Sequence, residues 1–186
     1  MRSDAAERRA RILRTARHLI AQHGADIALE AIASASEVGI ATLYRNFASR
    51  EELLAAVASD IVESIAAAAD ACAESAADDP ETAWRELIAA LVQLELGALT
   101  DAIASGLSAE SRAAVTRLQR RAVASITAAL HALRGAIRDD LTAEALITGI
   151  AIITRPQPAL QRAADQVVDD LVDAYLAWTL RGAHRG

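Results

Sequence analysis

The sequence predicts an all-α fold, and three observations support this class. Hydrophobic residues make up 53% of the 186 positions, with only three Pro and eight Gly to interrupt helices. Alanine and leucine, the strongest helix formers, dominate the apolar fraction, and runs of β-branched residues are scarce. Apolar residues also recur three and four positions apart through most of the chain, which is the spacing of one helix face. We expect about nine helices and no strand.

The first 50 residues contain three short predicted helices. Asp4 is expected to cap the first helix, and Gly24 is expected to end it. A second helix covers about residues 29–35 and buries its few apolar side chains. The third runs from Ile40 to Phe47, with Gly39 at its N-cap. The tight turn between the second and third helices is typical of a helix-turn-helix.

Two longer helices follow. Ser49 is a clear N-cap for a helix that runs to near Ser75, with acidic residues in its first turn that complement the helix dipole. Pro80, at or near the first helical position, opens the next helix. Residues 99–105 either continue that helix or form a separate short one after Gly97.

The remaining sequence predicts three helices. One begins near Ser111, and another begins at Thr142-Ala143-Glu144 and is apolar on almost every face. Pro156 and Pro158 stop it, because proline cannot continue a helix. The last helix is expected from Ala159 to Leu180.

Charge is distributed unevenly along the chain. All 19 basic residues are Arg, and the net charge is −6. Residues 1–50 contain eight Arg and five acidic residues, a net charge of +3, whereas the remainder has 11 Arg and 20 acidic residues, a net charge of −9. This asymmetry is typical of a basic nucleic-acid-binding segment attached to an acidic body.

The expected location is the cytoplasm. A single cysteine, Cys72, excludes an internal disulfide and suits a reducing compartment. The N-terminal residues are charged where a signal peptide has its apolar core. No apolar run reaches membrane-spanning length, so we expect no contact with a membrane.

The six residues Thr42 to Phe47 carry the strongest functional signal. Leu43 and Phe47 stand four apart and are expected to face inward, which turns the polar side chains outward. Thr, Tyr, Asn and Arg side chains donate hydrogen bonds to phosphate oxygens, and the apolar Ile40 and Ala41 suit thymine methyl groups. In the alternative interpretation, Tyr44 and Phe47 are core aromatics and Arg45 is a solvated charge.

Residues 9–54 resemble the tetracycline-repressor family of bacterial transcription regulators. The matching residues are His23-Gly24, Ile32-Ala33, Val38, Ala41-Thr42-Leu43-Tyr44, Phe47 and Ser49-Arg50-Glu51-Glu52-Leu53-Leu54. The resemblance implies a DNA-binding domain over residues 1–50 and an effector-binding and dimerisation domain over residues 51–186. It also implies two sets of DNA contacts. The base-facing positions are Ile40, Ala41 and Tyr44, and the phosphate-facing positions are Thr42, Arg45, Asn46 and Arg50.

The chain departs from the family pattern near the recognition helix. Glu37 stands where the family usually has Gly, in the turn after the second helix, and a positive φ there would cost roughly 1 kcal/mol. Gly39, where a capping Ser is common, completes the predicted DNA-binding set. The arginines of the first helix are expected to form a solvated face, with phosphate contacts as the alternative; they are Arg2, Arg8, Arg9, Arg11, Arg14 and Arg17.

The last two helices carry more apolar surface than one chain needs to bury, which predicts a homodimer. The alternative is burial of the same residues within a single chain. The residues expected at the dimer interface are Ile150, Ile153, Val167, Val168, Leu171, Tyr175 and Trp178.

The resemblance also implies a pocket for an effector within the C-terminal domain. The scarcity of aromatic residues and of charged interior residues in this domain favours a small apolar or amphipathic ligand. Glu95 either faces the interior or lies in water at the edge of the apolar stripe. The candidate lining residues are Trp84, Ile88, Leu91, Glu95, Leu118, Ala122 and Ile126.

These observations favour a sequence-specific transcriptional regulator, which we expect to be a repressor released from a palindromic double-stranded operator by a small molecule. Two other classes compete: a helical protein-interaction module and a small all-α enzyme. The enzyme is disfavoured because the four histidines show no metal-ligand pattern, Cys72 lacks a nearby His, and the chain has neither a Gly-rich phosphate loop nor a lysine. We therefore expect no catalytic residue, no metal and no cofactor.

Overall fold

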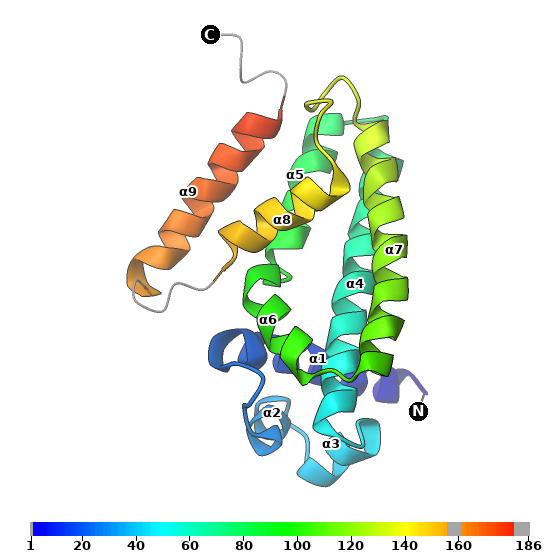
Figure 1. Ribbon diagram of the computed structural model, residues 1–186, viewed down its shortest axis with the longest axis vertical. Coiled ribbons are helices and arrows are strands. Elements are labelled where there is room, and N and C mark those ends of the chain that lie inside the picture. The colour runs from blue at the N-terminus through cyan, green and yellow to red at the C-terminus, as the bar shows by residue number, and fades with distance from the viewer. Residues whose placement is uncertain (1, 156–160, 181–186) are drawn as a thin grey trace. The chain divides into compact units, whose positions relative to one another are not determined.

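The computed structural model describes residues 2–155 and 161–180, and these residues form helices joined by short connections, with no strand among them (Figure 1). This confirms the predicted all-α class. Within the same ranges, no helix is long and apolar enough to cross a membrane. The helices are α1 (Arg2–His23), α2 (Leu29–Ala35), α3 (Ile40–Asn46), α4 (Arg50–Ser75), α5 (Pro80–Val92), α6 (Leu96–Gly106), α7 (Ala109–Ala132), α8 (Ala143–Ile153) and α9 (Gln161–Thr179).

Several expected helix ends are confirmed by their caps. Gly24 ends α1 with a φ of 85°, a conformation that glycine adopts without strain. The Ser49 hydroxyl accepts a hydrogen bond from the Glu52 N–H at 3.1 Å, as an N-cap does. Thr142 caps α8 in the same way, through the N–H of Ala145.

Two expected ends were wrong. The first helix begins at Arg2, so Asp4 lies inside its first turn, where a negative charge still complements the dipole. The last helix ends at Thr179, because Leu180 turns away to bridge Ile137. Its expected start at Ala159 lies outside the described residues, and α9 is described from Gln161.

The helix that begins at Pro80 does not continue through residue 105. It ends at Val92, and Glu95 then adopts a positive φ of 53° before α6 starts, so the separate short helix is the correct alternative. Gly97, at the start of α6, lies close to the end of α8. A Cβ atom at this position would collide with the backbone at Ala151 and Arg155, and the Gly97 N–H donates to the Thr154 hydroxyl at 3.0 Å.

The chain separates into two compact units. The first comprises residues 1–61 and 98–117, and the second comprises residues 62–97 and 118–186. Both α4 and α7 therefore contribute residues to each unit. The boundary expected after residue 50 concerns functional domains rather than packing units, and it stays a prediction.

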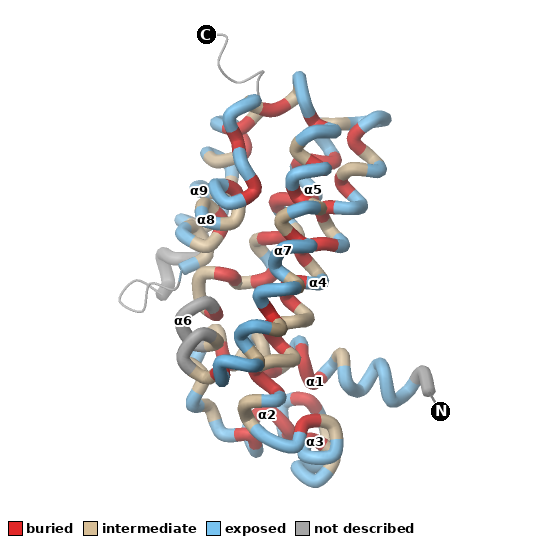
Figure 2. The backbone as a smooth tube through the Cα atoms, turned by 45° about the vertical axis from the view of Figure 1, so that its right-hand side comes forward, coloured by how far each residue is buried: buried red, intermediate tan, exposed pale blue. Residues whose placement is uncertain are grey.

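The first unit is built on a small core shared by three helices. Helix α1 packs on α2, and α2 packs on α3. Buried positions recur along α1, α2 and α3 in Figure 2. The fully buried large side chains of α1 to α3 and the residue that follows them are Ile12, Ile20, Ile32, Leu43 and Phe47.

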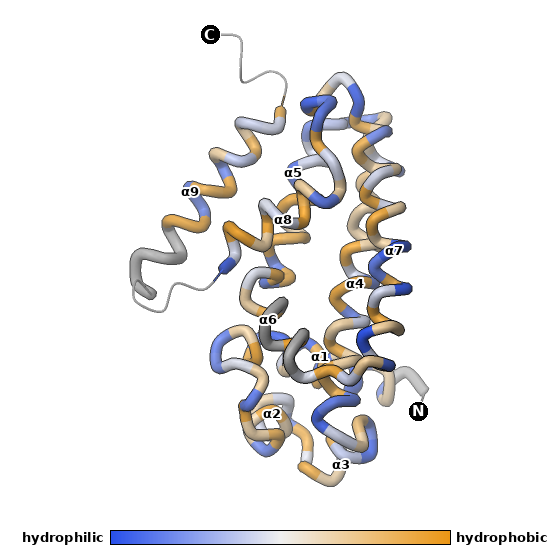
Figure 3. The backbone as a smooth tube through the Cα atoms, viewed as in Figure 1, coloured by the Kyte–Doolittle hydropathy of each residue, from blue (hydrophilic) through white to orange (hydrophobic). Residues whose placement is uncertain are grey.

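The second unit is centred on α5, which packs against both α8 and α9. Trp84 lies fully buried there, and its indole N–H donates to the hydroxyl of Thr179 at 2.9 Å, so the one polar atom of a large apolar side chain is satisfied. Helix α8 is the most continuously hydrophobic helix in Figure 3, as its sequence indicated.

Glu37 adopts a positive φ of 55°, the conformation expected where related sequences carry glycine. We predict that Glu37→Gly raises the free energy of unfolding by about 1 kcal/mol, because glycine has no Cβ to clash in this conformation. Urea denaturation followed by circular dichroism measures the change. Glu37→Ala is the control: it removes the same carboxylate but keeps the Cβ, and an equal gain from it would contradict the explanation.

Candidate nucleic-acid interface

Helix α3 presents both polar and apolar side chains to solvent. Leu43 and Phe47 are fully buried, as expected, whereas Ile40 and Tyr44 are 36% and 47% exposed. Arg45 is also exposed. The alternative in which Tyr44 is a core aromatic is therefore wrong. Of these two aromatic residues, only Phe47 lies in the core.

The outward side chains of α3 are ordered by hydrogen bonds to Thr42. The Arg45 guanidinium donates to the Thr42 hydroxyl at 2.7 Å, and the Asn46 side-chain amide donates to the Thr42 carbonyl at 2.8 Å. The Thr42 hydroxyl therefore accepts from Arg45 and keeps its own hydrogen for another acceptor. The arrangement gathers several donors on one face of a short helix.

Two arginines of α1 hold the helix-turn-helix together. Arg9 stacks over the Phe47 ring, with 4.3 Å between its guanidinium carbon and the ring centroid, and donates to the Asn46 carbonyl at 3.1 Å. Arg11 donates to the Ser36 carbonyl at 2.9 Å. Each arginine thus satisfies a carbonyl at or beside a helix C-terminus, where backbone acceptors lack intrahelical partners. Both arginines are exposed, as expected for a solvated face, and each also makes these contacts within the protein.

Arg50, expected to face phosphate, uses part of its guanidinium inside the protein. Its Nη1 atom donates to the Ala25 carbonyl at 2.5 Å and thereby joins the start of α4 to the loop after α1. A guanidinium has five N–H donors, so the contact with Ala25 occupies only one direction. The predicted phosphate contact of Arg50 stays a proposal.

The first turn of α4 is joined to the start of α7. The Glu51 carboxylate accepts hydrogen bonds from the Ser108 N–H at 3.1 Å and the Ser111 hydroxyl at 2.8 Å. These bonds, from Ser108 first and then Ser111, lower the pKa of Glu51 below its ordinary value of 4.5. The charged carboxylate therefore holds two helices of the first unit together.

This contact predicts a pH dependence of stability. Because the folded-state pKa of Glu51 is depressed, its stabilising contribution is present above about pH 4.5 and is lost as the pH falls through the folded value. Unfolding free energies measured at several pH values below 4.5 should decline less steeply for Glu51→Gln than for the wild type. Glu52→Gln, at the neighbouring position, is the control; identical slopes for the wild type and Glu51→Gln would contradict this role.

The candidate dimer surface lies on α8 and α9, and the structure changes its membership. Val167, Leu171 and Trp178 are 44–49% exposed on α9. Ile150, one of the expected interface residues, is fully buried within a single chain, whereas Ile152, which was not among them, is 68% exposed. The helical period does not distinguish these two positions when almost every residue of α8 is apolar. Three other candidates, Ile153, Val168 and Tyr175, are half-buried.

Trp178 is supported from within its own chain. The Arg138 guanidinium carbon lies 3.8 Å from the centroid of the Trp178 ring, and Asp140 forms an ion pair with Arg138. The Tyr175 ring lies beside Trp178, with 5.7 Å between centroids. Burial raises the pKa of the Tyr175 hydroxyl, so it remains protonated at neutral pH.

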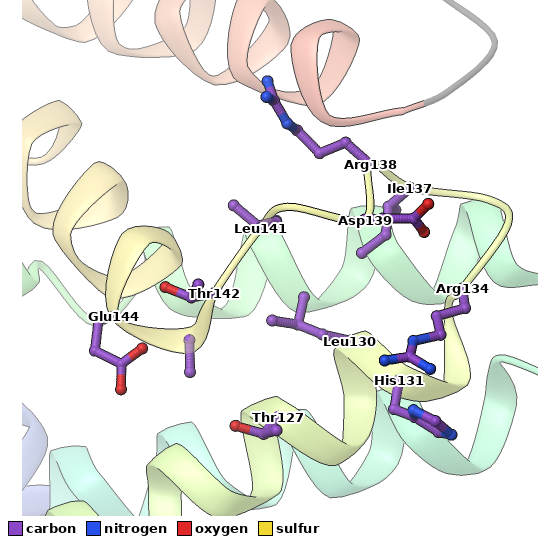
Figure 4. Close-up of a pocket in the computed structure, with 11 residues that line it drawn as sticks. Thr127, Leu130, His131, Arg134, Ile137, Arg138, Asp139, Leu141, Thr142 and Glu144 are labelled. Atoms are coloured by element: carbon purple, nitrogen blue, oxygen red, sulfur yellow. The ribbon is translucent and has the colours of Figure 1, made fainter.

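Five of the seven residues expected to line an effector pocket are packed in the core, and the role of all seven stays a prediction. Trp84, Ile88, Leu91 and Ile126 are fully buried, and Ala122 is almost so. None of the seven candidates lines the cavity of about 340 Å³ that opens between the end of α7 and the start of α8 (Figure 4). Leu118 and Glu95 are half-buried. Sequence reasoning missed this cavity because a loop without helical periodicity forms much of its wall.

The described residues contain no group of three or more His, Cys, Asp or Glu side chains placed to hold a metal ion. Burial, together with the charge of Glu86, raises the pKa of the Cys72 thiol to about 11. The nucleophilic thiolate form of Cys72 is therefore scarce at neutral pH.

Comparison with known proteins relates residues 12–57 to a known family and the whole chain to known structures. Residues 12–57 match the family model described as bacterial regulatory proteins, tetR family. A TetR transcriptional regulator from Streptomyces coelicolor is 27% identical, with a TM-score of 0.61, over 89% of this chain and 97% of that one. A TetR regulatory protein from Mycobacterium vanbaalenii is 26% identical, with a TM-score of 0.62, over 93% and 97%. LfrR from Mycobacterium smegmatis, solved in complex with proflavine, shares the fold at 22% identity, with a TM-score of 0.59, over 94% and 97%. No curated protein matches the sequence.

Proposed function

Because residues 12–57 belong to the tetR family of bacterial regulatory proteins, we propose that this protein is a dimeric repressor that binds a palindromic operator and releases it when a small molecule binds. DNA-binding transcriptional regulation is the general role of the fold that the chain shares with its structural relatives. The exposed face of α3 is the observation that carries the proposal.

In this proposal α3 enters the major groove with its N-terminal end toward the bases. Ile40 and Ala41 contact thymine methyl groups, and Tyr44 lies on the same edge. Exposure of Ile40 and Tyr44 supports this assignment, because both side chains are accessible to the bases. Gly39, before Ile40, allows close approach of the backbone.

The phosphate contacts come from the donors beside that edge. Thr42, Arg45 and Asn46 are linked by their mutual hydrogen bonds, so they meet the DNA backbone as one preformed group. Arg50 adds charge from the start of α4. With about eight phosphate contacts per dimer, the logarithm of the binding constant should fall with the logarithm of salt concentration with a slope near about −7.

A dimer places two copies of α3 on one operator. The apolar residues left exposed on α9, with Ile152 of α8, support a two-fold interface made by these helices from two chains. The spacing of two recognition helices in successive major grooves is roughly 34–36 Å. A ligand that favours a different spacing releases the operator, and α4, which contributes to both compact units, is the proposed link. The protein acts in the cytoplasm, where bacterial DNA lies.

Gel-shift binding to the DNA upstream of the chain's own coding sequence tests the DNA-binding proposal. We expect the double variant Tyr44→Ala, Arg45→Ala to lose specific binding, because it removes one base-facing and one phosphate-facing side chain, both of which are exposed. Circular dichroism and gel filtration are expected to show an unchanged fold and dimer.

Arg120→Ala is the matched control, since it removes an exposed arginine of α7 and leaves α3 intact. Its operator affinity should equal that of the wild type. Specific binding retained by the folded double variant would overturn the assignment and favour a helical protein-interaction module, the competing class that also explains the apolar surface of α9.

A further inference from the structure

The cavity between α7 and α8 has walls that are fixed by the loop between these helices. Gly135 adopts a φ of 95° and turns the chain after α7. The Arg138 N–H then donates to the Thr179 carbonyl at 2.9 Å, and Ile137 is buried and bridges Leu180. Because backbone contacts to α9 hold the loop, the cavity is formed before any ligand arrives, which lowers the entropic cost of binding.

Charged side chains border the cavity on two sides, and Asp139, which has an interaction of its own, also lines it. Figure 4 shows Arg134 and His131 at the end of α7, and Glu144 on the opposite side in the first turn of α8. No ion pair or hydrogen bond joins the side chain of Arg134 or Glu144 to any other described residue. Arg138 also borders the cavity, but its guanidinium is turned toward Trp178 and is paired with Asp140.

Apolar side chains lie between the two charged sides. Leu130 from α7 and Leu141 from the loop flank the middle of the cavity, together with the buried Ile137. The Thr127 hydroxyl borders the cavity on the α7 side. An apolar middle with a few convergent polar groups is the usual construction of a small-molecule site, and about 340 Å³ lies at the lower end of the range for such sites.

We propose that this cavity binds a small amphoteric molecule, with its anionic group at Arg134 and His131, its cationic group at Glu144, and an apolar segment against Leu130 and Leu141. A ligand with one charge leaves the opposite charge of the cavity unmatched. A ligand with both charges pairs Arg134 and Glu144 at once, across a distance that these two side chains do not bridge themselves. Leu130 and Leu141 disfavour a fully polar molecule, because such a ligand would give up water without a replacement.

The site stands apart from the effector position expected in the core of the second unit, and its occupation does not depend on whether the protein binds DNA. Its test therefore uses the full chain without DNA. Isothermal titration calorimetry with three amino carboxylates, 4-aminobutanoate, 6-aminohexanoate and 8-aminooctanoate, supplies ligands with both charges at graded separations. Hexanoate and hexylamine supply one charge each.

We expect at least one amino carboxylate to bind about tenfold more tightly than both singly charged probes, the effect of one additional charge-assisted hydrogen bond. Arg134→Gln should remove that advantage over hexylamine, and Glu144→Gln should remove it over hexanoate. Both side chains are exposed, so both variants should fold, and circular dichroism verifies this. Arg120→Gln, an exposed arginine of α7 that does not line the cavity, should bind every probe as the wild type does.

Three results would overturn the proposal: no binding of any amino carboxylate, equal binding of the singly and doubly charged probes, or unchanged affinities in both cavity variants. The gel-shift experiment on the operator is independent of each of them. Failure here therefore leaves the proposed DNA binding untouched, and failure there leaves this site untouched.

Discussion

Trp84→Ala should lower the free energy of unfolding by about 3–5 kcal/mol, the loss typical of truncating a buried aromatic residue. Trp84 is the largest fully buried side chain, and α5 packs against α8 and α9 around it. The truncation leaves a cavity at the centre of the second unit. It also removes the bond from the indole N–H to the Thr179 hydroxyl.

Urea denaturation followed by circular dichroism, at one fixed protein concentration, measures this loss. The fixed concentration matters because the proposed dimerisation would add to the apparent stability. Glu86→Ala is the matched control, because Glu86 lies on the same helix with an exposed side chain, and it should change the free energy of unfolding by less than about 0.5 kcal/mol. A loss for Trp84→Ala no larger than that of the control would mean that the second unit is not built around this residue.

Phe47→Ala should cost about 3–5 kcal/mol in the first unit and abolish operator binding at the same time. Phe47 is fully buried directly after α3, and Arg9 of α1 stacks on its ring. Its removal deprives α3 of its inner support and deprives Arg9 of its aromatic partner, so the recognition helix loses its fixed position.

Tyr44→Ala separates these two effects. Tyr44 lies on the same helix but is half exposed, so its truncation should weaken operator binding while the free energy of unfolding changes little. Urea denaturation and gel shifts on both variants make the comparison. Wild-type operator binding by a folded Phe47→Ala protein would contradict the proposed role of α3.

Helix caps and hydrophobic spacing predicted much of the fold, because both depend on residues only a few positions apart in the chain. The bounds of α2, the cap at Ser49 and the start of α8 beside Thr142 were correct, since a cap forms through contacts three residues away. The separation of α5 from α6 was left open. The start of α6 is packed at Gly97 against the backbone at Ala151 and Arg155, which lie more than fifty residues later in the chain, and local signals do not report such a contact.

The inward pair of α3 was also predictable, and its supports were not. The four-residue spacing placed Leu43 and Phe47 in the core, and both are fully buried. Sequence reasoning offered no basis for choosing Arg9 and Arg11, among the six arginines of the first helix, as the ones that hold the helix-turn-helix. Their partners, Asn46 and Ser36, are 37 and 25 residues away, so only the folded chain brings them together.

In the second unit the sequence also predicted the helices but not which of their residues are exposed. In α8 nearly every residue is apolar, so periodicity does not rank its faces, and packing alone buries Ile150 and exposes Ile152. The cavity between α7 and α8 likewise exists because the loop after Gly135 is held against α9. The sequence by itself determined the helices, their caps and the face that α3 presents, because hydrophobic spacing and capping are local. Only the tertiary structure decided which arginines contact distant carbonyl groups, which apolar residues remain exposed and where a cavity opens, because each of these depends on contacts between residues far apart in the chain.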